Sequence, residues 1–195
     1  TFRGATDLTK RGIPCIGIPG TIDNDVTATD ATIGYDTALS TTVGMIDCLR
    51  DTCESHARCN VVEVMGRNAG YIALESAIAT GAEAVIIKEI QHDEAAIIKR
   101  FAKLREEGKR SFIVVVSEGM AGYGEGFTAR LEEATGIESR FARLAHVVRG
   151  GSPSVSDRVL ATQMGAKAVE LLLAGKSNLV VCKRDDKIVS EDIAY

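Results

Sequence analysis

The sequence predicts an α/β fold, a three-layer sandwich built on a mostly parallel sheet. Short β-branched runs that are apolar almost throughout alternate with longer segments whose apolar residues recur at helical spacing. The 195 residues are 45% hydrophobic and 26% charged, a composition that supports one sizeable core in a globular protein. In folds of this class ligands bind where strands end and loops lead into helices, so those loops are where chemistry is expected.

Six strands are predicted, and most of them have the apolar character of strands that are buried on both faces. Three helices follow from apolar residues at spacings of three and four. The first residues enter a helical pattern without a cap and residues 188–195 stop without a closing element, so both ends are expected to be cut. The strands are residues 14–18, 60–65, 84–87, 112–116, 144–148 and 179–182, and the helices carry Leu39, Val43 and Ile46, then Ile97, Phe101 and Leu104, then Met164, Ala168, Leu171 and Leu172.

Charge and cysteine content exclude several classes of function. A net charge of −4 without Lys/Arg runs argues against nucleic-acid or membrane-surface binding, and no apolar run has transmembrane length. The five cysteines are odd in number and lack a C-x-x-C pair, which argues against a disulfide framework or a zinc site. A cytoplasmic location is expected.

The loop after the first strand, residues 20–25, collects carboxylates. Turn formation and helix capping explain Asp, Asn, Thr and Gly in such a segment, and spacing alone favours that interpretation. Alternatively, Asp23 takes a proton from a hydroxyl while Asp25 holds a magnesium ion.

The second strand ends in a glycine-flanked arginine, Arg67, before a helix expected to begin near Tyr71. Backbone N–H groups at that helix start suit an anion. The glycines at 122, 124 and 126 lack the dinucleotide-binding spacing and are expected to form a flexible surface loop. The segment 175–177 is not a P-loop because Glu170 stands where its first glycine is required.

Several basic residues lie beside predicted strands of this acidic protein. Each one alone is best explained as a solvated surface residue or a structural histidine. Together they indicate a phosphorylated small molecule, because guanidinium groups bind phosphate oxygens in pairs. These residues are Arg58, Arg67, Arg140, His146 and Arg149.

Four motifs in register, PGTIDND, EVMGRNAGYIAL, VVVSEG and HVVRGGSPSVSDRVLA, with RDTCESHAR between the first two, closely resemble the phosphofructokinase family. The resemblance covers nearly the whole chain. It implies transfer of the ATP γ-phosphate to the 1-hydroxyl of fructose 6-phosphate, giving fructose 1,6-bisphosphate in glycolysis. It also implies an internal fragment of a bacterial-type enzyme that lacks the upstream nucleotide-binding segment and the C-terminal end, and that is inactive alone.

The resemblance implies a role for each site residue. Asp23 is the catalytic base, Asp25 positions Mg²⁺, and Thr21 and Arg67 support the transferred phosphoryl group. In the family, the residues that match Arg58 and Arg140 extend from a neighbouring subunit, which implies a homo-oligomer. The sugar is held by Met65, Gly66 and Glu118, and its 6-phosphate by Arg58, Arg140, His146 and Arg149.

Donor choice and regulation rest on fewer residues. Members that use pyrophosphate typically carry a lysine where this chain has Gly20, so the resemblance favours ATP. Arg50, Glu83 and Lys109 match or neighbour positions of an allosteric effector site, with an exposed charged surface as the equal alternative.

The resemblance also implies two domains. Residues 1–34 and 150–195 form a partial nucleotide-binding domain, and residues 35–149 form the sugar-phosphate-binding domain. Apolar faces left uncovered would favour oligomerisation. The alternatives are a pyrophosphate-dependent phosphofructokinase or a non-catalytic sugar-phosphate-binding fragment, although Asp23 argues for a catalytic parent.

Overall fold

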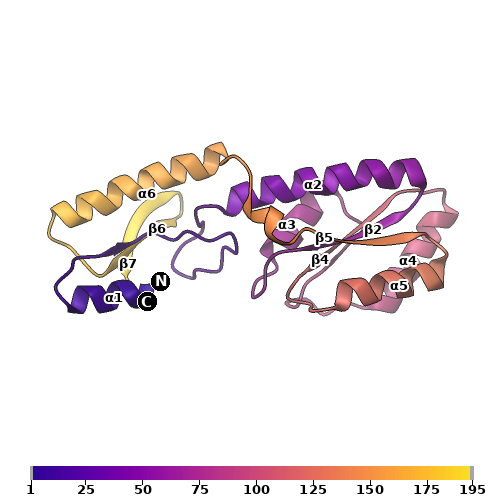
Figure 1. The fold of residues 1–195 in the computed structure, drawn as a ribbon, viewed down its shortest axis with the longest axis horizontal. Coiled ribbons are helices and arrows are strands. Elements are labelled where there is room, and N and C mark those ends of the chain that lie inside the picture. Colours follow the sequence, from indigo (N-terminus) through magenta and orange to yellow (C-terminus); the bar gives the residue numbers. More distant parts are fainter. Residues whose placement is uncertain (1, 194–195) are drawn as a thin grey trace. The chain divides into compact units, whose positions relative to one another are not determined.

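The computed structural model describes residues 2–193, which fold into two compact units (Figure 1). One unit combines residues 1–37 with 152–195, and the other is residues 38–151. The sequence predicted boundaries after residues 34 and 149. Within the described residues no helix combines the length and the apolar character that crossing a membrane requires.

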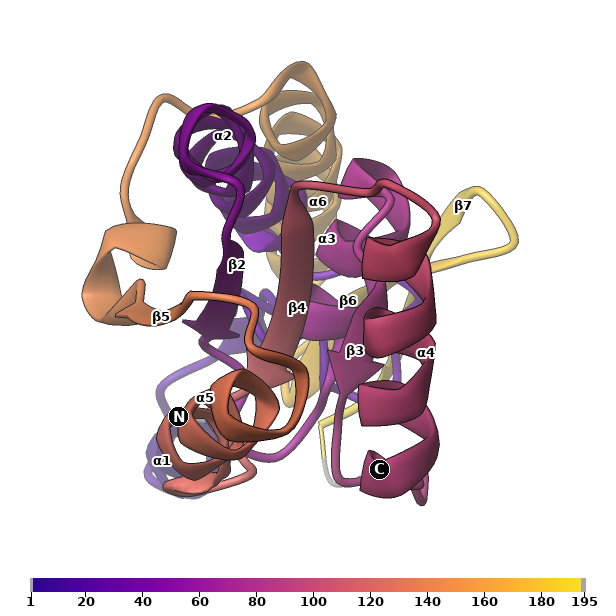
Figure 2. The ribbon, with the colours of Figure 1, turned by 90° about the vertical axis from the view of Figure 1, so that its right-hand side faces the viewer.

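A four-stranded parallel sheet forms the centre of the unit 38–151. Its strands are β2 (Cys59–Val64), β3 (Ala84–Ile86), β4 (Phe112–Ser117) and β5 (Ser139–Arg143). Figure 2 shows their order, β3-β4-β2-β5. The inner strands β2 and β4 are buried at every residue, as their mostly apolar runs predict, although β2 also buries Asn60 and Glu63. The predicted mostly parallel α/β fold is therefore confirmed.

Helices cover both faces of this sheet. They are α2 (Tyr35–His56), α3 (Tyr71–Thr80), α4 (Glu94–Glu106) and α5 (Tyr123–Thr135). Phe101 of α4 and Phe127 of α5 pack against alternate β2 and β4 residues in one core, while Asn60 of β2 donates to Leu49 of α2 from the other face. Figure 1 shows α2 and α3 on one side and α4 and α5 on the other. This unit is a three-layer sandwich.

The prediction of a strand at residues 144–148 is wrong. Residues Ser139–Arg143 form β5 instead, and a 3₁₀ helix, η1 (Ala145–Arg149), follows. The ladder ends where Leu144 N–H donates to Glu63 O, and Ala145 then turns the chain with a φ of 46°. The valines of η1 indicated a strand, whereas β5 is an edge strand whose polar residues concealed it.

The glycines near residue 122 do not form a surface loop, contrary to the prediction. Gly122 caps α5, and Gly124 and Gly126 lie within that helix. A Cβ on Gly124 would approach the Phe141 ring to 2.8 Å, so this glycine permits α5 to pack directly on β5.

The other unit has a smaller three-stranded sheet, in the order β1-β6-β7. Its strands are β1 (Ile16–Gly17), β6 (Leu179–Arg184) and β7 (Lys187–Asp192), and its helices are α1 (Phe2–Lys10) and α6 (Val155–Leu173). Met164 and Leu171 of α6 pack against Val181, while Phe2 of α1 packs with Val180 and Cys182. Val155 and Leu173, the first and last residues of α6, are 78% and 84% exposed.

A hairpin closes this sheet near the end of the chain, where the sequence predicted no element. Strand β7 pairs antiparallel with β6 through a two-residue turn, Asp185–Asp186, whose φ angles are 47° and 60°. Aspartate tolerates this left-handed conformation, which matches the twist of the flanking strands. Without an Asn-Gly or Asp-Gly pair, the turn gave no clear sequence signal.

Candidate functional site

The acidic loop of the first unit follows the carboxyl end of β1, as predicted. Asn24 holds its shape with a φ of 49°. The Asn24 Oδ1 accepts hydrogen bonds from the Thr32 N–H at 3.0 Å and the Thr32 hydroxyl at 3.2 Å, and its amide donates to Asp30 O at 3.3 Å. Asn24, which lies between the two aspartates, therefore forms a turn, as one of the two interpretations of this loop predicted.

Around this turn lie the loop residues that were predicted to act next to the phosphoryl donor. The Asp23 N–H donates to Thr21 Oγ1 at 3.2 Å, and Asp25 is exposed. Gly20, Thr21 and Asp25 line a cavity of about 270 Å³. Within residues 2–193 no group of three or more His, Cys, Asp or Glu side chains is placed to hold a metal, so this loop offers single carboxylates and no closed cage.

In the unit 38–151, the loop after β2 is held by the turn that follows β4. The Ser117 hydroxyl donates to Gly66 O at 2.7 Å, and the Glu118 Oε1 accepts from the Gly66 N–H at 3.4 Å. Because β2 and β4 are parallel neighbours, both loops leave the sheet at its carboxyl edge. The predicted pair Gly66 and Glu118 is therefore in contact.

Residues after β3 hold the rest of the same loop. The Lys88 ammonium donates to Arg67 O at 3.3 Å, and the Glu89 Oε1 accepts from the Gly70 N–H at 2.8 Å. The start of α3 thus already binds a carboxylate of the chain itself, where an external anion was expected. Arg67 remains exposed on a backbone that is fixed at both ends.

His146 and Arg149 lie in η1, which begins where β5 leaves the sheet. Since Leu144 N–H donates to the carbonyl of Glu63, near the end of β2, η1 starts at the same carboxyl edge. Six predicted substrate residues of this unit therefore follow the carboxyl ends of its strands, namely Met65, Gly66, Arg67, Glu118, His146 and Arg149.

Arg58 and Arg140 lie toward the opposite end of the sheet. Arg58 precedes β2, whereas Arg67 follows it, and six extended residues span about 20 Å. Both Arg58 and Arg140 pair instead with Glu138, at 3.4 and 2.7 Å. A single copy of the unit does not bring these two arginines to Arg67.

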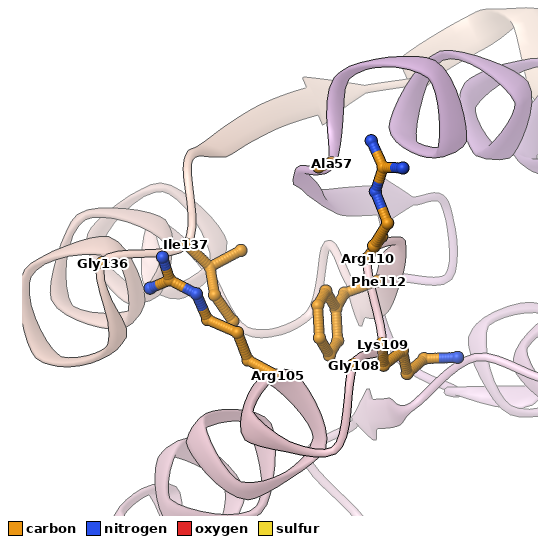
Figure 3. A pocket seen from close by; sticks show the side chains of 8 residues that line it. All are labelled: Ala57, Arg105, Gly108, Lys109, Arg110, Phe112, Gly136 and Ile137. Atoms are coloured by element: carbon orange, nitrogen blue, oxygen red, sulfur yellow. The ribbon is translucent and has the colours of Figure 1, made fainter.

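The predicted effector residues all have partners within the chain. Buried Glu83 pairs with Lys109 at 2.9 Å and accepts from the Ile113 N–H at 2.6 Å, and Arg50 donates to Thr80 O. Lys109 also borders a pocket of about 220 Å³ (Figure 3). The other residues that line this pocket are Ala57, Arg105, Gly108, Arg110, Phe112, Gly136 and Ile137.

Sequence reasoning missed the residues that hold the loops. Asn24 was treated as one turn former among several, and Ser117, Glu89 and Glu138 were given no role. Glu89 follows β3 just as Glu118 follows β4, and this shared position after a strand is the signal that would have indicated it.

The α/β fold and these residues define a class of protein that binds its ligands at the carboxyl ends of parallel strands. The model of the family "Phosphofructokinase" matches residues 1–172. The chain belongs to the phosphofructokinase family.

Its curated relatives include proteins named ATP-dependent 6-phosphofructokinase from several Bacillus species. The chain is 51% identical to those of Bacillus licheniformis and Bacillus subtilis over 193 residues, 99% of its own length. The chain spans about 60% of the length of these relatives.

Solved structures give the same fold. The phosphofructokinase of Saccharomyces cerevisiae matches 93% of this chain and 26% of its own, with a TM-score of 0.87 and 35% identity. A pyrophosphate-dependent phosphofructokinase from Marinobacter aquaeolei matches 99% of this chain and 55% of its own, with a TM-score of 0.82 and 25% identity.

Proposed function

We propose that this chain is part of an ATP-dependent 6-phosphofructokinase, which moves the γ-phosphate of ATP to the 1-hydroxyl of fructose 6-phosphate. The observation that carries the proposal is the loop Gly20–Asp25. It presents two carboxylates, Asp23 and Asp25, and its residues Gly20 and Asp25 line a cavity, in a chain 51% identical to proteins named for that activity.

On the donor side, the residues of this loop divide the work of phosphoryl transfer. Asp23 takes the proton from the sugar 1-hydroxyl as that oxygen attacks phosphorus. Asp25 suits Mg²⁺, which typically binds one or two carboxylates together with substrate phosphate oxygens, and the ion would supply charge neutralisation. Thr21 and Arg67 stabilise charge on the transferred group, since such catalysis depends mainly on positioning and electrostatics.

On the sugar side, the carboxyl edge of the larger sheet holds fructose 6-phosphate. Met65, Gly66 and Glu118 contact the sugar, and His146 and Arg149 bind its 6-phosphate. Arg58 and Arg140 lie too far from Arg67 to join them within one copy, because β2 alone spans about 20 Å. This distance supports a homo-oligomer in which a neighbouring copy supplies both arginines.

ATP is favoured over pyrophosphate at Gly20. A Cβ built on this residue would meet no atom within 4 Å, so the space beside the loop is open to an α-phosphate. A lysine side chain would fit there and would fill that space with charge and bulk. Pyrophosphate dependence is the second candidate, because the Marinobacter relative has that activity in its name.

The proposed effector residues already have partners within the chain. Binding of an effector near Arg50, Glu83 and Lys109 would have to compete with the partners that these residues already have.

The free cysteines within residues 2–193 suit a reducing cytoplasm. A non-catalytic sugar-phosphate-binding fragment would need no base at Asp23.

The experiment that tests this function compares the thermal stabilisation of the chain by fructose 6-phosphate with that by fructose. Saturation at a hundred times the dissociation constant should add about 2.7 kcal/mol to the free energy of unfolding. We expect a response to the phosphate ester only, reduced in Arg149→Ala and unchanged in Lys99→Ala, an exposed residue of α4. No response in a chain shown to be folded would contradict binding of this substrate by the chain.

A further inference from the structure

Two arginines converge on one carboxylate at the amino end of the larger sheet. In the ladder between β2 and β5, Cys59 is opposite Ser139 and Asn60 opposite Arg140, so residue 58 falls beside residue 138. The Cys59 N–H donates to Glu138 O at 2.8 Å, which fixes this alignment. Glu138 and Arg140 are two residues apart along the strand direction and share a face of it.

The side chains of these residues form an unequal ion cluster. Glu138 Oε1 lies 3.4 Å from an Arg58 guanidinium nitrogen and 2.7 Å from one of Arg140. Two cations thus share a single carboxylate oxygen, which leaves one positive charge in excess. The Glu138 side chain is 43% exposed, so water screens both pairs and each is weak.

A phosphate group matches this pair of arginines better than the carboxylate does. It carries up to two negative charges and three free oxygens, and guanidinium groups bind such oxygens in pairs. Glu138 instead meets one nitrogen of each arginine. Arg140 additionally donates to the carbonyl of Ser139, at 3.1 Å.

We propose that Glu138 is a specificity-determining residue that acts through Arg58 and Arg140. Its carboxylate occupies the place of a phosphate between the two arginines, and only a ligand of higher charge density displaces it. The arginine pair therefore selects a phosphate ester over a carboxylate ligand. That the ester is fructose 6-phosphate rests on the proposed function, whereas the competition between Glu138 and a phosphate does not.

The test is a titration of the whole chain with inorganic phosphate at constant ionic strength, followed by NMR. Glu138→Gln removes the competing charge at nearly constant shape. Two solvent-screened ion pairs of about 0.2–1 kcal/mol each predict a dissociation constant roughly two- to thirtyfold lower than in the unsubstituted chain. A merely structural residue would give no tighter binding when it is replaced.

Two variants serve as controls. Glu133→Gln changes an exposed carboxylate near the end of α5 and should leave phosphate affinity unchanged. Adding Arg140→Ala to Glu138→Gln should abolish the gain. An unchanged or higher dissociation constant in Glu138→Gln, or no detectable binding in either protein, overturns the inference. A gain for phosphate without any response to fructose 6-phosphate supports the inference and contradicts the substrate assignment.

Discussion

At the scale of single residues, glycines explain how the two loops of the larger sheet pack against each other. Gly66 has a φ of +126°, and a Cβ there would lie 2.5 Å from Ala69 O. A Cβ on Gly119 would lie 2.8 Å from Arg67 O. Neither position has room for a side chain, so these glycines fix the distance between Arg67 and the turn that carries Glu118.

We expect Gly66→Ala to lower the free energy of unfolding by about 1–3 kcal/mol, because it combines a left-handed φ with a backbone clash. Urea denaturation measures the change. Gly44→Ala is the matched control, since this exposed glycine lies inside α2 and its Cβ would have no neighbour within 4 Å. It should stabilise the unit by about 0.5–1 kcal/mol. Equal effects of both substitutions would show that Gly66 is not sterically required.

The role of a single residue could be predicted from the sequence only where the residue belongs to a recognisable motif. Asp23, Arg67 and Glu118 lie within contiguous motifs, and their predicted roles remain proposals. The contact of Glu89 with Gly70 joins loops after β3 and β2, which are separated by β4 in the sheet and by 19 residues in the chain. No local pattern encodes such a contact.

At the scale of elements, an ion cluster joins the beginnings of α4 and α5. Glu94 accepts hydrogen bonds from Arg130 at 2.6 and 2.9 Å and from the Tyr123 hydroxyl at 2.5 Å. His92 contacts the same hydroxyl at 2.9 Å. The hydrogen bonds from Arg130 lower the pKa of Glu94 to about 2, whereas burial raises the pKa of Tyr123. The cluster fixes the start of α5, just after the turn that carries Glu118.

We expect Glu94→Gln to cost about 1 kcal/mol of stability at pH 7, a typical value for hydrogen bonds to a charged group that is partly exposed. Because the folded-state pKa of Glu94 lies below its ordinary value of 4.5, its contribution is present above pH 4.5 and is lost as the pH falls toward 2. Urea midpoints should therefore differ between the two proteins at pH 7 and converge near pH 2. A cost of Glu94→Gln that stays constant between pH 7 and pH 2 would contradict the role of its charge.

Helices and strands were predicted well where burial gives a segment a regular apolar pattern, and poorly where it does not. Central strands such as β2 and β4 are buried on both faces and mostly apolar, so their runs are easy to recognise. The edge strand β5 contains two exposed arginines, Arg140 and Arg143, and the valines of η1 resemble those of a strand. The hairpin of β6 and β7 depends on two aspartates with positive φ, a conformation that their sequence permits but does not require.

At the scale of the whole molecule, the positions of Arg58 and Arg67 at opposite ends of β2 predict complementation between copies. Arg58→Ala and Arg67→Ala should each abolish the thermal response to fructose 6-phosphate. When the two variants are mixed and reassembled, random pairing in a two-fold dimer should restore about a quarter of the sites. Mixing Arg67→Ala with Arg149→Ala is the control and should restore none, because both residues belong to the same edge. Equal recovery in both mixtures would contradict a shared site.

The division into two units could not be predicted from periodicity. One unit is assembled from both ends of the chain, residues 1–37 and 152–195, so its sheet pairs β1 with a strand more than 150 residues away. Strand and helix patterns are local and carry no information about such pairing. The predicted boundaries came from the family resemblance, and the nucleotide-binding and sugar-binding roles of the two units remain predictions.

In a cell that carries two alleles of this gene, lesions at the two ends of β2 would be inherited alike. A lesion at Arg67 inactivates the edge of the copy that bears it, whereas a lesion at Arg58 disables the edge of the neighbour. Beside one intact allele, either lesion would leave one working site in each mixed dimer and about half of all sites, so the output would follow gene dosage. Two alleles with different lesions, one at each arginine, would complement each other in part, whereas two alleles with the same lesion would not.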